Sequence, residues 1–170
     1  MVTSSKGASN HEAAYILGMQ VQRLTDQPRD ILPYDPGTLP TRPAPKAGDV
    51  IRIEVDGLPP AKTIRRSIRN ENHPKYESFV LLRRKATAAM AGRAWVFGPV
   101  AVNITLFGPS NDGSSMVDYL GGVMDTLDGS SGPTFTYLPI VFEDDCQVVR
   151  SEVKLQDHPT SKYLIEVEVL

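Results

Sequence analysis

Residues 98–129 read GPVAVNITLFGPSNDGSSMVDYLGGVMDTLDG and predict a β-strand followed by an α-helix. The strand is expected over 98–109, because Gly-Pro pairs enclose an apolar run rich in β-branched residues. The helix is expected over 114–129, where Gly129 provides a stop signal. The apolar residues of this helix recur at helical intervals: Val117, Leu120, Met124 and Leu127. The two elements together indicate a domain that mixes helices with strands.

Neighbouring segments predict the remaining elements of the core. Alternating apolar residues predict a strand over 49–57, and an apolar face predicts a helix from Tyr76 to about Gly92. Residues 140–155, IVFEDDCQVVRSEVKL, read as a turn that feeds a strand, and residues 163–170 alternate as a closing strand. This order predicts a single compact α+β domain, with a mixed or antiparallel sheet flanked by two main helices.

Residues 1–46 are expected to form an extension to a core domain of residues 47–170. Ser9 and Glu12 suit a capping box that opens a short helix. Six prolines follow within this segment and favour an extended tether. The helical and Pro-rich extension is expected to dock on the core or on another subunit, or to bind a protein partner.

Composition places the chain among globular proteins and excludes several other classes. Hydrophobic residues make up 41% of the chain and charged residues 22%. No run of about 18 apolar residues occurs, so we expect no membrane partner. The first residues lack the apolar stretch of a secretory signal. The single cysteine, Cys146, cannot form an internal disulfide and is expected to be an inert thiol. We therefore expect a cytoplasmic protein.

Charge is distributed unevenly along the chain. Residues 57–95 hold nine basic and two acidic residues, whereas residues 96–170 hold three basic and eleven acidic residues. A basic segment followed by an acidic one suits a phosphate-binding groove beside a cation site. The alternative is a mixed surface on which the two halves complement each other.

The run Glu143-Asp144-Asp145 is the densest group of acids in the sequence. Magnesium is a hard cation that prefers carboxylate oxygens, so the run suits a divalent metal site. A metal-dependent nuclease uses such acids to activate water and to offset charge on the scissile phosphate. Adjacent carboxylates repel one another, however, and a solvated turn is the alternative interpretation.

Five segments, taken in order, resemble the RusA family of Holliday-junction resolvases. They are GLPPAKTIRR at 57–66, the helix over 75–92, the strand over 98–109, VDYLGGVMDTLDG at 117–129 and FEDDCQVVRSEVK at 142–154. The resemblance implies a RusA-like fold and a small homodimer that grips four-way junction DNA. It also implies symmetric cleavage with Mg²⁺ or Mn²⁺, as expected of a structure-specific endodeoxyribonuclease in DNA recombination and repair.

Two motifs of the family are matched closely. The family carries an acidic box, Asp-x-Asp-Asn-x-x-Lys-x-x-x-Asp-Ala-Leu, and Asp125-Thr126-Leu127 matches its end. The later Asp-Asp-x-Gln-Val motif is matched by residues 144–148. The resemblance implies that catalysis and metal binding depend on Asp118, Asp144 and Asp145, with Asp112 able to reach in from the preceding loop.

The acidic box departs from the family pattern where metal ligands are expected. Without a gap, Ser115 and Val117 stand at the two metal-binding aspartates and Gly121 stands at the lysine. With one deletion at the glycines, Asp118 becomes the second aspartate and Met116 falls at the first. One carboxylate and the lysine are missing in either alignment, so we expect cleavage to be weakened or lost.

The pair Gly121-Gly122 interrupts a helix that lines Asp118 and Asp125 along one face. Each glycine costs about 1 kcal/mol relative to alanine within a helix and supplies no functional group. One interpretation is a site that has lost its side chains. The other is close packing of the helix against the sheet or against a dimer mate.

A set of basic residues is expected to contact DNA phosphates without reading base sequence. The set comprises Lys62, Arg65, Arg66, Arg69, Arg83, Arg84 and Lys85. A plain solvated surface is the alternative for these residues. Of the nearby aromatic residues, Trp95 and Phe97 precede a strand and are expected in the core.

Two functional hypotheses follow from the sequence. The first is a RusA-like protein that binds branched or junction DNA, with a nuclease site that departs from the family pattern. The second is a non-catalytic adaptor that kept the fold and the dimer and binds a protein partner through residues 1–46.

Overall fold

The computed structural model describes residues 40–62, 67–109, 112–129 and 138–170, and the expected N-terminal helix lies outside these ranges. In chain order the elements are β1 (Val50–Asp56), α2 (Tyr76–Met90), β2 (Val100–Phe107), α3 (Met116–Leu127), the short 3-10 helix η2 (Asp145–Gln147), β3 (Val148–Gln156) and β4 (Lys162–Val169). The described part of the chain is therefore an α+β domain, as the sequence predicts.

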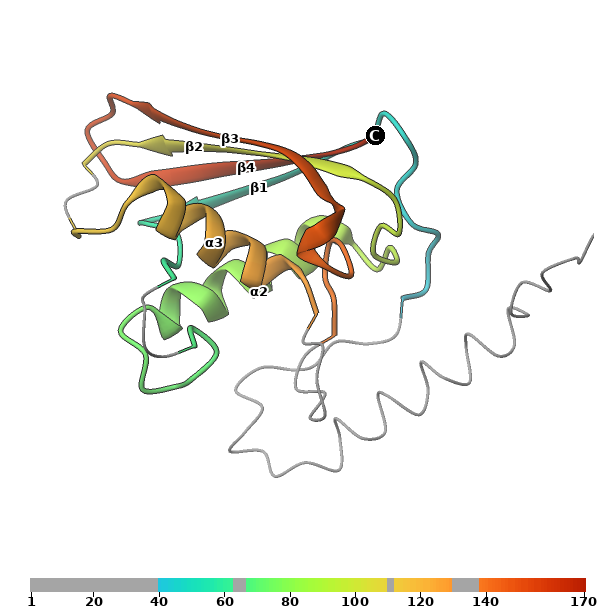
Figure 1. Ribbon diagram of the computed structural model, residues 1–170, viewed down its shortest axis with the longest axis horizontal. Coiled ribbons are helices and arrows are strands. Elements are labelled where there is room, and N and C mark those ends of the chain that lie inside the picture. Colours follow the sequence, from blue (N-terminus) through green and yellow to red (C-terminus); the bar gives the residue numbers. More distant parts are fainter. Residues whose placement is uncertain (1–39, 63–66, 110–111, 130–137) are drawn as a thin grey trace, which may run out of the picture.

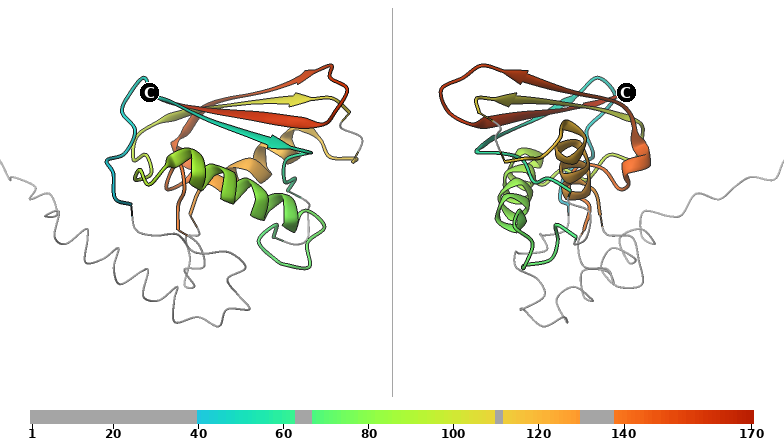
Figure 2. Two further views of the ribbon diagram at one scale, coloured as in Figure 1. Left: turned by 180° about the vertical axis from the view of Figure 1, so that it is seen from behind. Right: turned by 60° about the vertical axis from the view of Figure 1, so that its left-hand side comes forward.

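The four strands form one mixed sheet in the order β1-β4-β2-β3. Strand β4 pairs antiparallel with both β1 and β2, whereas β2 and β3 are parallel. Parallel neighbours need a crossover connection, and α3 lies within it. Both α2 and α3 lie against the same face of the sheet (Figures 1 and 2).

The core fills the space between the two helices and this face of the sheet. On β1, Ile51, Ile53 and Val55 are buried while the residues between them are exposed, which is the alternation of a half-buried strand. On α3, Tyr119 and Val123 are fully buried and point their apolar surface into the same cluster. Burial of this continuous cluster is what fixes α3 against the sheet.

The opposite face, called here the open face, carries charged side chains that pair across strands. Arg52 on β1 binds Glu166 on β4 at 2.8 Å, and Arg150 on β3 binds Glu168 at 2.8 Å. Lys162 similarly binds Glu54 at 3.0 Å. Cross-strand pairs of opposite charge suit a solvated sheet surface.

The aromatic residues before β2 divide between core and surface. Trp95 is buried, as expected, but the expectation that Phe97 packs in the core is wrong, because its side chain is 67% exposed. Residues 95–97 are not part of a strand, and Trp95 and Val96 are both buried, so no regular alternation places Phe97 on the same side as Trp95. Within the described ranges, no helix combines the length and apolarity needed to cross a bilayer.

Candidate functional site

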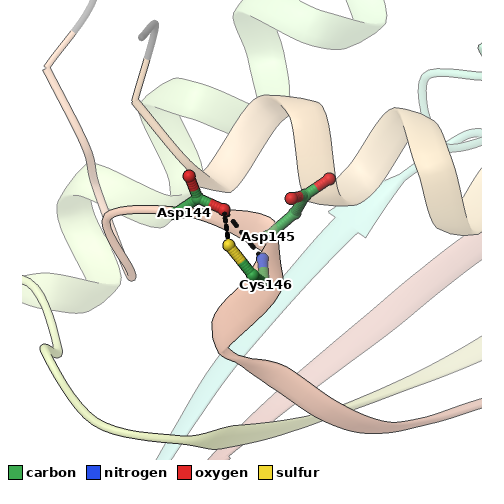
Figure 3. A group of neighbouring side chains, drawn as sticks. All are labelled: Asp144, Asp145 and Cys146. Carbon is green, nitrogen blue, oxygen red and sulfur yellow. Dashed lines mark hydrogen bonds between the residues drawn. The ribbon is translucent and has the colours of Figure 1, made fainter.

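The acidic run forms a turn that begins with a cap. Asp144 accepts a hydrogen bond from the amide of Cys146 at 2.8 Å and another from its thiol (Figure 3). The side-chain oxygen of Gln147 accepts from the amides of Glu143 at 2.8 Å and Asp144 at 3.0 Å. These reciprocal bonds form a capping box around η2 and satisfy amides that the short helix leaves free.

Gln147 also anchors this turn to the rest of the fold. Its side-chain amide donates to the carbonyls of Val96 at 2.9 Å and Gly98 at 2.8 Å, just before β2. One amide group thus makes four hydrogen bonds, two within the turn and two to the neighbouring segment. The Asp-Asp-x-Gln spacing therefore places two carboxylates on a turn with a fixed position relative to the sheet.

Three consecutive side chains on this turn could hold a metal ion. The ligand atoms of Asp144, Asp145 and Cys146 all lie within 4.8 Å of one another (Figure 3). The hydrogen bond to Asp144 raises the pKa of the Cys146 thiol, which favours a protonated sulfur that donates rather than a thiolate ligand. The two carboxylates are therefore the stronger ligands for a hard cation.

The end of α3 brings two further acids toward this turn. Burial raises the pKa of Asp128 to about 7, and the charges of Asp125 and Asp145 act in the same direction. The pKa of Asp145 is raised by the partial desolvation of its exposed side chain, by the hydrogen bond and charge of Asp144 and by the charge of Asp125. The charge of Asp145, which adjoins Asp144, is thus coupled to those of Asp125 and Asp128, and these four acids are called here the acid cluster.

Backbone contacts hold the two halves of the acid cluster together. The amide of Gly129 donates to the carbonyl of Glu143 at 3.3 Å, and the amides of Ile140 and Val141 both donate to the carbonyl of Leu127 at 3.1 Å. The C-terminal end of α3 therefore contacts the segment that leads into η2. Asp128 was not among the residues predicted from the sequence, where its only signal is its place at the helix end beside Gly129.

The structure does not bring Asp118 into the acid cluster, contrary to the predicted metal set. Asp118 lies in the first turn of α3, where its carboxylate accepts from the amide of Ser115 at 2.8 Å and from its hydroxyl at 2.7 Å. These bonds hold the pKa of Asp118 below its usual range. Asp125 lies two turns further along, about 10 Å along the helix axis. Asp118 thus caps the helix and does not join Asp144 and Asp145.

Asp112 is also occupied elsewhere. Its carboxylate accepts hydrogen bonds from Lys75 and from the hydroxyl of Tyr119, and one oxygen accepts from the amide of Ser114 at 3.0 Å. Partial burial opposes ionisation, but the bonds from Lys75 and Tyr119 prevail and hold the pKa of Asp112 well below its usual range. Asp112 therefore ties the loop before α3 to the start of α2 and is not a ligand of the acid cluster.

Two of the predicted phosphate-binding residues serve the fold instead. Arg83 is only 2% exposed, and its guanidinium donates to the carbonyls of Thr126 at 3.0 Å and Leu138 at 2.7 Å. Arg69 binds the Asp128 carboxylate and the Asp125 carbonyl, both at 2.8 Å. For Arg83 the prediction of a DNA contact is wrong, because a buried guanidinium cannot reach a phosphate. Both arginines stabilise the end of α3 by binding its carbonyls.

The remaining basic residues differ in their surroundings. Arg84 and Lys85 are exposed on α2. Lys62 is exposed as well, and its ammonium lies 3.1 Å from the Asp125 carboxylate. Arg65 and Arg66 lie outside the described residues. Lys62 is therefore the basic residue of the predicted set that the structure places both at the acid cluster and at the surface.

The paired glycines of α3 contact a loop rather than the sheet. A Cβ added to Gly122 would lie 2.0 Å from the carbonyl oxygen of Pro60, and one added to Gly121 would lie 3.3 Å from the Cδ of Lys62. Close packing was one of the two interpretations of this pair, and it is observed, but the helix packs here against residues 60–62 and not against the sheet.

No family model and no curated protein matches the chain.

Proposed function

We propose that this protein binds branched DNA and holds a divalent cation at the acid cluster, as a RusA-like protein whose cleavage activity is weak or lost. The observation that carries the proposal is the contact between the segment that bears Asp144 and Asp145 and the C-terminal end of α3, where the Asp125 carboxylate binds the exposed amine of Lys62. Opposite charges at one exposed site suit a cation and a phosphate bound side by side. The order of the RusA-like motifs along the sequence supports the proposal, and the proposal includes a homodimer.

The residues fit Mg²⁺ or Mn²⁺ better than a thiolate-binding metal. Asp144 and Asp145 supply carboxylate oxygens, and Mg²⁺ commonly keeps several waters when only one or two carboxylates bind it. The protonated thiol of Cys146 donates to Asp144 and helps to orient that carboxylate. When bound, the cation would lower the pKa of a coordinated water and offset charge on a phosphate.

The chain's own residues explain why cleavage is expected to be weak. Asp118 is held in the helix cap, so it does not supply the third carboxylate. Asp125 is the remaining candidate on that helix face, and its carboxylate already binds Lys62. With fewer oxygens to hold the cation, binding of DNA is expected to be better preserved than hydrolysis.

A salt titration of DNA binding tests the proposal. The full chain is mixed with a fluorescent four-way junction, and anisotropy is measured over a series of NaCl concentrations without divalent cation. Contacts to several phosphates predict that log K falls steeply with log salt. Affinity that ignores salt, or no binding, would refute DNA binding.

A cleavage assay tests the cation site independently. The labelled junction is incubated with Mg²⁺ or Mn²⁺ and either the natural protein or Asp145→Asn. Slow nicking that disappears in Asp145→Asn would support a residual nuclease. Rapid paired nicking would contradict the expected loss of activity, and nicking that persists in Asp145→Asn would place the reaction elsewhere.

The adaptor hypothesis also receives support from one observation. Arg69 and Arg83 are used within the fold, which leaves Lys62, Arg84 and Lys85 as the exposed members of the predicted set among the described residues. An adaptor needs no salt-dependent DNA binding. The salt titration therefore distinguishes the two proposals, because the adaptor predicts no junction complex.

A further inference from the structure

The loop that carries Lys62 crosses α3 at its paired glycines. A Cβ added to Gly122 would lie 2.0 Å from the carbonyl oxygen of Pro60 and 3.0 Å from the Cα of Ala61. Backbone atoms cannot be approached so closely, so only glycine admits the loop at this position. The amide of Lys62 also donates to the carbonyl of Asp118 at 2.9 Å. The loop backbone is thus fixed on the helix where the Lys62 side chain begins.

The Lys62 side chain then follows the helix toward the acid cluster. Its aliphatic part lies over Gly121, since an added Cβ there would be 3.3 Å from Cδ and 3.5 Å from Cβ of Lys62. Its ammonium lies 3.1 Å from a carboxylate oxygen of Asp125, one turn further along. The charge of Lys62 also acts on Asp145, where it partly opposes the rise in pKa that desolvation and the neighbouring acids cause. A loop lysine therefore fills the space beside position 121, where the helix has no side chain of its own.

Lys62 is more accessible than the arginine that binds the same end of the helix. Its side chain is 60% exposed, whereas that of Arg69 is 24% exposed and is held by Asp128 at 2.8 Å. An exposed ion pair such as Lys62 with Asp125 contributes little to stability. The ammonium can therefore exchange a carboxylate for a phosphate at small cost to the fold.

We infer that Lys62 is the phosphate-binding residue of the acid cluster, and that Gly121 and Gly122 make room for the loop that delivers it. The inference rests on the proposed function, and it assigns a phosphodiester contact of the bound DNA to this point. The ionised carboxylates of the acid cluster repel a phosphate backbone. An ammonium among them donates to a phosphate oxygen and lets that backbone approach the carboxylates.

The test compares junction binding by four proteins over a series of NaCl concentrations: the natural chain, Lys62→Met, Lys62→Arg and Lys154→Met. Loss of one phosphate contact is expected to weaken binding about threefold to tenfold and to reduce the salt slope by about one. Lys62→Arg keeps the charge and should bind as the natural chain does. Lys154 is the matched control, because it is an exposed lysine 2.9 Å from Glu152, on the strand β3 at the edge of the sheet.

The outcomes separate this inference from the proposed function. Salt-dependent binding that is equal in the natural chain and Lys62→Met would overturn the role of Lys62 and leave the proposed function standing. The same loss in Lys154→Met as in Lys62→Met would also overturn it, because the effect would then be one of net charge. Absence of salt-dependent binding in the natural chain would overturn both.

A titration with Mn²⁺ gives a readout without DNA. Removing the ammonium beside Asp125 is expected to raise Mn²⁺ affinity in Lys62→Met, measured by calorimetry, but not in Lys62→Arg. Urea unfolding of each variant confirms that the fold is intact. Equal Mn²⁺ affinity in the natural chain and Lys62→Met would show that Lys62 does not act on the carboxylates, and would overturn its assignment to the acid cluster.

Discussion

The two neighbouring glycines of α3 are expected to respond in opposite ways to the same substitution. In Gly122→Ala the new Cβ would lie 2.0 Å from the oxygen and 2.5 Å from the carbon of the Pro60 carbonyl. Because these neighbours are backbone atoms, the loop or the helix must move. Overpacking of a filled site costs about 3 kcal/mol at the upper end of its usual range. Alanine regains about 1 kcal/mol of helix propensity, which leaves a net loss of about 2 kcal/mol.

Gly121→Ala provides the matched control one residue away. Its Cβ would lie 3.3 Å from the Cδ of Lys62, which belongs to a flexible and exposed side chain that can shift. The gain in helix propensity then dominates, and the free energy of unfolding should be unchanged or higher by up to about 1 kcal/mol.

Urea unfolding followed by circular dichroism measures both variants. With a slope of about 2 kcal/mol per molar, the loss in Gly122→Ala corresponds to a midpoint lower by about 1 M urea. Gly122→Ala as stable as the natural chain would refute the close crossing of Pro60 over α3. Equal destabilisation by both substitutions would instead point to a backbone requirement shared by the pair.

Three further predictions concern the surroundings of the acid cluster. Asp128 has a pKa of about 7 in the folded chain, against about 3.9 in the unfolded chain. The protonated carboxyl therefore stabilises the folded state, and this contribution to the free energy of unfolding is fully present below pH 4 and is lost as the pH rises to 7. Relative to Asp128→Asn, the natural chain should therefore lose up to about 4 kcal/mol between pH 4 and 7 in urea unfolding, and parallel pH profiles would contradict this. Arg83→Ala should cost about 3 kcal/mol or more, because it leaves two carbonyls of a buried site unbound, whereas the exposed neighbour Arg84→Ala should change stability by less than about 0.5 kcal/mol. Equal effects in thermal unfolding would show that Arg83 is not anchored as described. Gln147→Ala should weaken Mn²⁺ binding about tenfold in calorimetry, because the turn loses the bonds that position its carboxylates, and unchanged affinity would place the cation elsewhere.

The elements of the core could be read from the sequence because each depends on a local pattern. The strand expected over 98–109 is Val100–Phe107, and the helix expected over 114–129 is Met116–Leu127. Gly-Pro pairs and helical spacing act within a few residues, so no tertiary information was needed. The sheet order, with β3 beside β2, could not be derived in the same way.

The acid cluster shows where local patterns are insufficient. The sequence indicated Asp144 and Asp145, but the charges that act on Asp145 include that of Asp125, which lies on α3 in a different part of the chain, and the end of this helix contacts the segment before η2. Asp118 was predicted because the alignment with the acidic box of the RusA family compares positions along the chain. Which end of α3 contacts the segment before η2 depends instead on tertiary packing. Only tertiary contacts show which end of α3 meets the turn.

The misassigned arginine carried a signal in the sequence. Arg83 lies four residues after Phe79 and one after Leu82, and both are fully buried on the inner face of α2. Helical spacing therefore places Arg83 beside the apolar face, and Arg84 outside it. Charge alone led to a surface assignment, although the periodicity of the helix favoured an inner position for one of the two.

The dependence of η2 on Gln147 has an evolutionary consequence. The amide of Gln147 holds the turn through backbone atoms, while Asp145 lies exposed on it. A single codon change at position 145 can therefore alter chemistry without disturbing the core, and a reversion can restore it. Natural selection can act on reactivity and on foldability separately in such a chain, so lineages that differ in one property need not differ in the other.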